Sequence, residues 1–439
     1  MLKRMFSIGG SALALSLTVL IGGGCSKSGS TGPSGGGAGL VVTVTGKVVG
    51  VNGQAVGGVP VSVPGKPSTN SDAGGNFSIA NVTTPYDISV VDAANKEALV
   101  YKGLTRTDPT LLFFGSSPGT GHTGSISGKI SGGEFTPNQP ATDVTDVAFA
   151  SAATNGYAST AANGTFGAIN LSWYGPTATT GSLYAIQFTA GAGGLPVASG
   201  YKGYGVRSGI AVNDGSTLTN QFDTLQSVTT NQFTGTVTVP SGYTLGFKAV
   251  YARVSQSAVI DLFAEINANA SMSYYAPGIP GATLMLEAYA TKAGGGTAVF
   301  WKTGLATAAT GVSITLVAPP EVSLPVNAAT GVDTTVTFSW TAMTGGVHLV
   351  VFEGAGSTPT YFVLTSGTSA TIPNMKPFGL GLPASTSYSW FVYGFGPFGS
   401  VDAAAGSAGF VTGLLGVPVA ATGDVYNGES ATRTFTTAP

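Results

Sequence analysis

The sequence is poor in cysteine, histidine and charge. It has one cysteine and two histidines in 439 residues, and charged residues make up 8% of the chain, against roughly 25% in typical soluble domains. A single cysteine cannot form an internal disulfide, and His122 and His348 lie too far apart in the sequence to suggest a shared zinc site. The net charge of −2 gives no long-range attraction to nucleic acid. We therefore expect no cofactor, no metal and no nucleic-acid partner.

Long apolar runs are also scarce, and the one at the N-terminus is too short to span a membrane. Lys3 and Arg4 precede an uncharged run over residues 5–20, which gives the charged and apolar regions of a secretory signal peptide. A spanning helix needs about 20 apolar residues. The sequence therefore predicts that residues 1–24 are a signal peptide and that the protein is exported.

The end of this leader consists of small residues, IGGG at 21–24, before Cys25. It resembles the lipobox of bacterial lipoproteins, although that family prefers Leu where Gly22 stands. The resemblance implies that Cys25 carries a lipid and anchors the protein, at the outer membrane, on its periplasmic side or at the cell surface. The alternative is cleavage by the ordinary signal peptidase, with Cys25 an incidental residue. Residues 25–39 are rich in Ser and Gly and predict a flexible tether.

Glycine is abundant, with 67 residues, and no long, well-capped helical pattern occurs. Short runs alternate apolar and polar residues between Gly, Asn and Pro, which is typical of antiparallel strands with one solvated face. The best helical candidate, residues 258–268, also alternates, with Ile260, Leu262, Ala264 and Ile266 on one face, so we predict a strand there. The fold class is all-β. The chain beyond the leader is long enough for three or four tandem β-sandwiches of about 100 residues.

Three blocks share an order of elements. Each opens on a similar motif, VTGKV at 44–48, ISGKI at 126–130 and, more faintly, FTGTV at 233–237. Each closes on an aromatic residue followed by lysine, at Tyr101-Lys102, Tyr201-Lys202 and Trp301-Lys302. Loop lengths differ between the blocks, as duplicated β modules permit. We predict sandwiches over 40–115, 125–228 and 232–318, the second and third being divergent repeats of the first.

The first block carries VTGKV at 44–48, GVPVSV at 58–63, TNSD at 69–72 and GGNFSI at 74–79. These motifs resemble the carboxypeptidase regulatory-like domain, a small transthyretin-like sandwich. That domain carries no catalytic residues, so the resemblance implies an accessory role.

The last block, residues 320–439, carries FSW at 338–340, TSYSWFV at 386–392 and TFTT at 434–437. It resembles a fibronectin type III or similar immunoglobulin-like domain. The resemblance implies that Trp340 and Tyr388 are core residues. The alternation of large aromatics indicates the same, because such rings supply much of the buried area of a sandwich.

The motifs that could carry catalysis do not fit their mechanisms. Residues 115–119 (GSSPG) match G-x-S-x-G, but a nucleophile elbow needs a strand-to-helix turn, and the proline lacks the N–H of an oxyanion hole. Asp261 and Glu265 would lie roughly 13 Å apart on a strand, beyond the about 5–5.5 Å of a retaining glycosidase pair. Asp72 and Asn76 lack the ligand ladder of a calcium loop and favour a hairpin turn. We expect no enzyme.

Aromatic residues cluster in stretches rich in Gly and Pro, and the candidate ligand contacts are Trp173, Tyr174, Tyr201 and Tyr204. Exposed rings can stack on sugars or enter a partner's pocket. The alternative is that the rings fill the ends of sandwiches.

Two function classes remain. The first is a non-enzymatic surface lipoprotein whose modules act as spacer, scaffold or adhesion elements that bind protein or polysaccharide. The second is an accessory subunit of an envelope transport, assembly or polysaccharide-processing complex.

Overall fold

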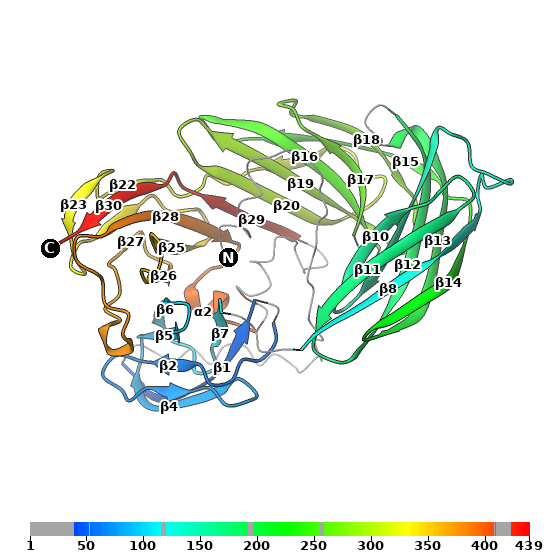
Figure 1. The fold of residues 1–439 in the computed structure, drawn as a ribbon. Helices are drawn as coiled ribbons and strands as arrows, with labels where there is room; N and C mark the ends of the chain where they lie inside the picture. Colours follow the sequence, from blue (N-terminus) through cyan, green and yellow to red (C-terminus); the bar gives the residue numbers. More distant parts are fainter. Residues whose placement is uncertain are drawn as a thin grey trace.

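The computed structural model describes residues 39–51, 53–115, 120–191, 196–254, 259–407, 409 and 423–439. Cys25, the leader, most of the tether and most of the GSSPG motif lie outside these residues. Within them the only helical segments are a 3-10 turn, η1 (Lys376–Phe378), and the short helix α2 (Val401–Ala404). The predicted all-β class is confirmed (Figure 1).

Module 1, as we call β1–β7, is a sandwich of two sheets. Its strands are β1 (Val41–Gly50), β2 (Pro60–Ser62), β3 (Thr69–Asn70), β4 (Asn76–Thr83), β5 (Tyr86–Asp92), β6 (Glu97–Leu104) and β7 (Thr110–Phe113). One sheet has the order β4-β1-β7, with β1 and β7 parallel, and the other the order β3-β2-β5-β6. Apolar side chains of alternating positions fill the space between the two sheets.

Modules 2 and 3 repeat this topology strand for strand. Module 2 consists of β8 (Gly121–Gly132), β9 (Asp143–Ser151), β10 (Asn155–Ser159), β11 (Thr165–Tyr174), β12 (Ala178–Ala190), β13 (Pro196–Asn213) and β14 (Ser216–Leu225). Module 3 consists of β15 (Thr230–Thr238), β16 (Tyr243–Arg253), β17 (Val259–Glu265), β18 (Ser271–Pro277), β19 (Thr283–Lys292), β20 (Thr297–Leu305) and β21 (Val312–Thr315). Their sheets have the orders β11-β8-β14 with β10-β9-β12-β13, and β18-β15-β21 with β17-β16-β19-β20. All three modules thus have the same strand order.

Two predicted block limits fall inside strands. Residue 125 lies within β8 and residue 232 within β15, because the repeated motif occupies the middle of the opening strand and not its start. The strand predicted at 258–268 is present as β17, with Ile260 and Leu262 buried. The alternation predicts Ile266 on the same face of this strand, but Ile266 lies beyond β17 and is 72% exposed.

The glycine of the repeated motif has one structural role in all three modules. A Cβ on Gly46, Gly128 or Gly235 would lie 2.4, 1.8 or 2.4 Å from a backbone carbonyl oxygen just before or within the parallel seventh strand. Only glycine lets the first strand approach the seventh this closely. In modules 1 and 2 a phenylalanine stands opposite, Phe77 against Gly46 and Phe166 against Gly128.

Module 4 is a sandwich of two sheets whose strand order differs from that of modules 1 to 3. One sheet has the order β22 (Val322–Leu324), β24 (Phe338–Trp340), β27 (Ser369–Ala370). The other contains β23 (Ala329–Val332), β25 (Val347–Gly354), β26 (Thr360–Thr365), β28 (Ser387–Gly396), β29 (Gly423–Glu429) and β30 (Arg433–Thr437). Trp340 is 4% exposed and Tyr388 1% exposed, so their predicted core positions are confirmed.

The four modules are not joined only end to end, because one 14-stranded sheet runs through three of them. Strand β29 of module 4 pairs antiparallel with β20, the edge strand of module 3. Strand β26, at the other side of module 4, pairs in parallel with β6, the edge strand of module 1. Module 4 therefore lies between modules 3 and 1, and the first and last modules are neighbours (Figure 1).

Hydrophobic packing follows the same arrangement. The core of module 1 includes residues of module 4, among them Leu349, Phe362 and Val401. The core of module 3 likewise includes Ile186, Phe188 and Tyr201 of module 2. Burial across the seams stabilises the assembly by roughly 25 cal/mol for each Å² of apolar surface removed from water.

Candidate functional site

Two of the four candidate ligand aromatics are core residues, and their prediction as surface contacts is wrong. Trp173 is 1% exposed, and its indole N–H donates to the carbonyl of Pro176 at 2.8 Å. Tyr201 is 5% exposed and donates to the carbonyl of Tyr275 in module 3 at 3.3 Å. Both rings lie at inward positions of their alternating strands, so they pack in the core and are not available to a ligand.

The other two candidates differ from each other. Tyr174, the last residue of β11, is 44% exposed. Tyr204 is half-buried, its backbone pairs with Gln226, and burial raises the pKa of its hydroxyl. Tyr174 is thus the one predicted aromatic whose ring is open to a ligand.

His122 is held between two acceptors. Its Nδ1 lies 3.0 Å from a carboxylate oxygen of Asp214, and its Nε2 lies 3.0 Å from the carbonyl oxygen of Gly175. A neutral imidazole donates from only one nitrogen, whereas an imidazolium satisfies both acceptors. The carboxylate of Asp214, as acceptor of the hydrogen bond from the ring, accordingly raises the pKa of His122, and this contact ties the turn between β13 and β14 to β8.

His348 has the opposite surroundings. The backbone N–H of Met343 donates to its Nε2 at 3.0 Å, while its Nδ1 lies 2.8 Å from the carbonyl of Gly367. One donor and one acceptor fit a neutral ring, and burial lowers the pKa of His348. The two histidines lie in modules 2 and 4, and each contacts groups of its own module.

The two carboxylates singled out in the sequence have different surroundings. Glu265 pairs with the fully buried ammonium of Lys248 and accepts a hydrogen bond from Tyr274 at 2.8 Å. For Asp261, desolvation by the surrounding protein and repulsion from Asp146 raise the pKa of the carboxyl to about 6.

The turn at Asp72 is closed by hydrogen bonds within the chain. The carboxylate accepts from the backbone N–H groups of Gly74 and Asn76, both at 2.8 Å, and the Asn76 bonds lower its pKa. The turn leads from β3 to β4, which belong to different sheets. It is therefore a connection between the layers of module 1 and not the hairpin turn that the sequence suggests.

Asp223 was missed at the level of sequence. It is 8% exposed, and burial raises its pKa to about 6. Its Oδ2 has no hydrogen-bond partner among the described residues. The carboxylate sits against Gly205, where a Cβ would come within 2.6 Å of Oδ2. Asp223 stands two residues before the buried Leu225 and so on the same inward face of β14. A charged residue in a strand is expected to face solvent, so the sequence alone does not indicate that this carboxylate is buried.

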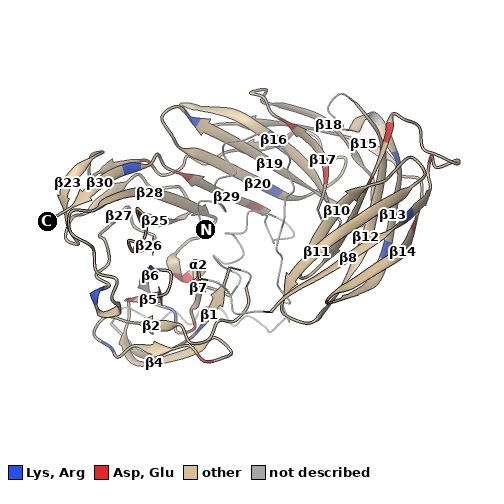
Figure 2. Cartoon of the chain, in the orientation of Figure 1, with Lys and Arg blue, Asp and Glu red and all other residues tan. Residues whose placement is uncertain are grey.

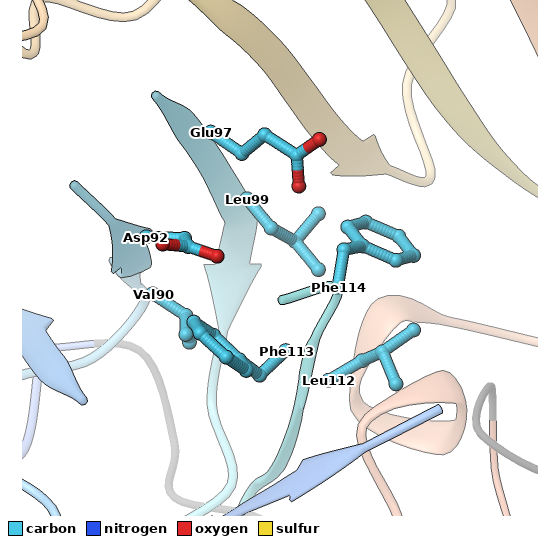
Figure 3. A pocket seen from close by; sticks show the side chains of 7 residues that line it. All are labelled: Val90, Asp92, Glu97, Leu99, Leu112, Phe113 and Phe114. Carbon is cyan, nitrogen blue, oxygen red and sulfur yellow. The ribbon is translucent and has the colours of Figure 1, made fainter. Parts of the chain in front are cut away.

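The pocket shown in Figure 3 lies at the end of module 1. Its lining residues are Val90, Asp92, Glu97, Leu99, Leu112, Phe113 and Phe114. Asp92 is bound by its own turn, with the side-chain amide of Asn95 donating to it at 2.7 Å. Burial, with repulsion from Asp92, raises the pKa of Glu97. The space holds about one water molecule, which is too small for an organic substrate.

Charge is spread thinly over all four modules (Figure 2). In the part of the chain that the structure describes, no three His, Cys, Asp or Glu side chains are grouped to hold a metal ion. Over the same residues, no helix has the length and apolar character of a membrane span.

One set of polar contacts between modules lies at the seam of modules 1 and 4. We call this the 1/4 seam: β6 with β26, and α2 with residues 105–110. Five residue pairs join the strands, from Glu97 with Thr360 to Tyr101 with Leu364. In α2, the carboxylate of Asp402 accepts from the N–H groups of Thr105 and Arg106, at 2.9 and 3.0 Å.

The second contact, the 3/4 seam, joins β20 to β29 through seven residue pairs. Lys302 of the repeated aromatic–lysine motif pairs with Asp424 across it at 2.7 Å. Tyr426 stacks on Phe300, with ring centroids 6.1 Å apart and planes 8° from parallel. The β26 and β29 edges of the module 4 sheet are thus each paired with a strand of another module, which removes two open strand edges that would otherwise pair with other chains.

The strand pairing defines the class of the protein: a multi-module β-sandwich protein in which three modules share one strand topology and the fourth has a different one. No family model and no curated protein sequence matches the chain. Among solved structures, it is similar to the TIE protein of Bacillus anthracis at 9% identity, covering 63% of this chain and 50% of that one, with a TM-score of 0.15. The chain therefore spans half the length of that protein.

Two further solved structures show similar values. The FN1–FN3 domains of chicken CNTN1 match at 11% identity, over 73% of this chain and 100% of that one, with a TM-score of 0.17. BcpA, the major pilin subunit of Bacillus cereus, matches at 10% identity, over 63% and 99%, with a TM-score of 0.15. TM-scores this low do not indicate a shared overall fold.

Proposed function

We propose that the chain is a non-enzymatic, exported scaffold protein that is anchored to the bacterial envelope by a lipid on Cys25 and used for adhesion. The observation that carries the proposal is the 14-stranded sheet that runs from module 3 through module 4 into module 1. Backbone pairing of this kind holds the modules in fixed orientations, which a scaffold needs and a flexible string of domains lacks.

Several features support this proposal over an enzymatic one. Asp72, Glu265 and His348 are engaged in local structural hydrogen bonds or ion pairs, and the pocket of Figure 3 has room for about one water. The low charge also suits a protein that works beside a polymer or a partner without long-range electrostatic steering. On this proposal Tyr174 is the first residue to test for contact with a polysaccharide or protein, because its ring is open to solvent.

The anchor is tested by a Cys25→Ser variant. We expect the wild-type protein in the membrane fraction, carrying a lipid that mass spectrometry detects, and the variant in the soluble fraction. Retention of an unmodified Cys25→Ser protein in the membrane fraction would contradict the anchor. Digestion of intact cells by added protease then tells the cell surface from the periplasmic side.

Binding is tested by screening the exported chain against envelope glycans and surface proteins, then comparing Tyr174→Ala with Phe222→Ala. Phe222 is a matched control, since it is 54% exposed on the same module. We expect a loss of binding of about tenfold for Tyr174→Ala alone, or about 1.4 kcal/mol. Equal binding by both folded variants would remove Tyr174 from the proposal. Co-purification of the chain with one envelope complex would favour the accessory role instead.

A further inference from the structure

The two ends of the described chain enter strands that are paired on both sides. β1, which begins at Val41, lies between β4 and β7, and it is parallel to β7. β30, which ends at Thr437, lies between β28 and β23, and it is parallel to β23. A pull on either end loads these ladders along the strand, so that many hydrogen bonds must break together instead of one after another.

Modules 1 and 4, which receive such a pull, are also bound directly to each other. Besides the strand pairing, the N–H of Thr360 donates to the carbonyl of Lys96 at 2.9 Å, and that of Thr110 donates to Ala405 at 2.7 Å. The rings of Phe114 and Phe362 lie 4.7 Å apart inside the shared core. The 1/4 seam therefore combines a backbone ladder, a buried apolar contact and the bonds of Asp402.

We propose that the 1/4 seam makes the chain a closed loop that bears tension: force applied between the two ends passes through modules 1 and 4, and modules 2 and 3 carry none until the seam opens. The covalent route through modules 2 and 3 begins after Phe113 in module 1 and returns at Val322 in module 4. While the seam fixes the separation of these two points, pulling on the ends does not lengthen that route. Modules 2 and 3 are thus a reserve of length that the seam releases.

This inference goes beyond the scaffold role and does not depend on the lipid or on any ligand. It explains why module 4 lies between modules 3 and 1. Module 4 pairs with one edge strand of each, β20 and β6, and this pairing completes the loop. A chain held at one end by the envelope and at the other by a bound object would resist moderate force at full stiffness. It would lengthen under higher force without detaching.

The test is single-molecule force spectroscopy on the full chain. The chain is expressed from Cys25 onward without the leader, so that no lipid is added. A handle is attached to the thiol of Cys25, the only cysteine in the sequence, and a second to a tag after Pro439. Unfolding of module 2, over Gly121 to Leu225, adds roughly 350 Å of extended chain, at about 3.3–3.6 Å per residue. We expect steps of this size only after a first rupture that opens the seam.

Three variants make the order of events decisive. Asp402→Ala should shift the first rupture to lower force, because it strips the acceptor from two N–H groups of module 1. Gly128→Ala, which weakens module 2, should leave the first rupture unchanged and lower only the later step. Asp424→Ala, at the exposed Lys302 pair of the 3/4 seam, is the matched control and should leave the first rupture unchanged.

A first rupture at lower force in Gly128→Ala would overturn the proposal, as would module 2 or 3 steps that precede seam opening in the wild type. If Asp402→Ala fails to fold, the comparison of Gly128→Ala with the wild type still tests the order of rupture, because this substitution lies in module 2 and leaves the 1/4 seam intact. None of these readouts involves binding or membrane attachment, so they are independent of the tests of the proposed function.

Discussion

His122 and His348 show how two residues of one type acquire opposite charge states from their neighbours. The first faces a carboxylate and a carbonyl, so that only an imidazolium satisfies both, while the second faces one donor and one acceptor. Neither preference is visible in the sequence, because Asp214, Gly175, Met343 and Gly367 are brought to the rings by the fold.

We predict that the two histidines titrate on opposite sides of pH 6.5. The raised pKa of His122 means that its contribution to stability is complete below pH 6.5 and is lost as the pH rises through its folded pKa. The lowered pKa of His348 means that its contribution is present above pH 6.5 and is lost as the pH falls through its folded pKa. With two histidines in the chain, an NMR titration should show two imidazole signals, and a His122→Asn variant assigns them. A single shared pKa near 6.5 would contradict the geometry.

The glycine of the repeated motif gives a second prediction at this scale. In Gly128→Ala the new Cβ would lie 1.8 Å from the carbonyl oxygen of Gln221, so β8 and β14 must separate, at a cost of about 1–3 kcal/mol. Gly167 is the control in the same module, since a Cβ there meets nothing within 4 Å. Alanine at Gly167 should be neutral or stabilise by up to about 1 kcal/mol. Urea unfolding of both variants measures the difference, and equal stabilities would refute the packing reason.

At the scale of elements, the pairing of β16 with β17 contains a buried charge. The Lys248 side chain is fully buried, and its ammonium contacts Glu265, directly opposite on β17, and the carbonyl of Asn269. The Glu265 side chain is 24% exposed and so keeps contact with water. The pair fixes the register of an edge strand more than it adds net stability, since desolvation offsets much of the attraction.

We therefore expect the two halves of this pair to respond differently to removal. Lys248→Met should be neutral or stabilising, because an apolar chain of similar length replaces a buried charge. Glu265→Ala should destabilise module 3 by about 1–3 kcal/mol, because it leaves a buried ammonium with fewer partners; the partial exposure of Glu265 limits the cost. Thermal unfolding of both variants checks the order. A larger loss in Lys248→Met than in Glu265→Ala would show that the pair itself stabilises the fold.

At the scale of the whole molecule, module 4 protects the edges of modules 1 and 3. A chain that ends at Pro319 would expose the outer edges of β6 and β20, and open edges of apolar strands pair with other molecules. We expect light scattering to show that this truncated chain self-associates. In the full chain these two edges are paired with module 4 and are not available for association. A Val299→Lys substitution in the truncated chain should reduce the association, because lysine on an edge strand opposes pairing. A monomeric truncated chain would show that module 4 is dispensable for edge protection.

The sequence by itself determined the all-β class. Alternation placed Ile260, Leu262, Trp340 and Tyr388 inside, because side-chain polarity records which face of a strand is buried. Side-chain polarity does not tell an aromatic ring that packs in the core from one that binds a ligand at the surface. For this reason the sequence allowed both roles for Trp173 and Tyr201, and the structure shows that they are buried.

Only the tertiary structure decided how the modules are joined. The pairs β6 with β26 and β20 with β29 are made by backbone N–H and C=O groups, which every residue but proline carries in full, so no residue pattern announces which edge meets which. The sequence therefore describes a row of sandwiches. The closing of that row into a loop, with modules 1 and 4 side by side, depends on edge pairing between segments far apart in the chain, and only the folded arrangement of strands shows it.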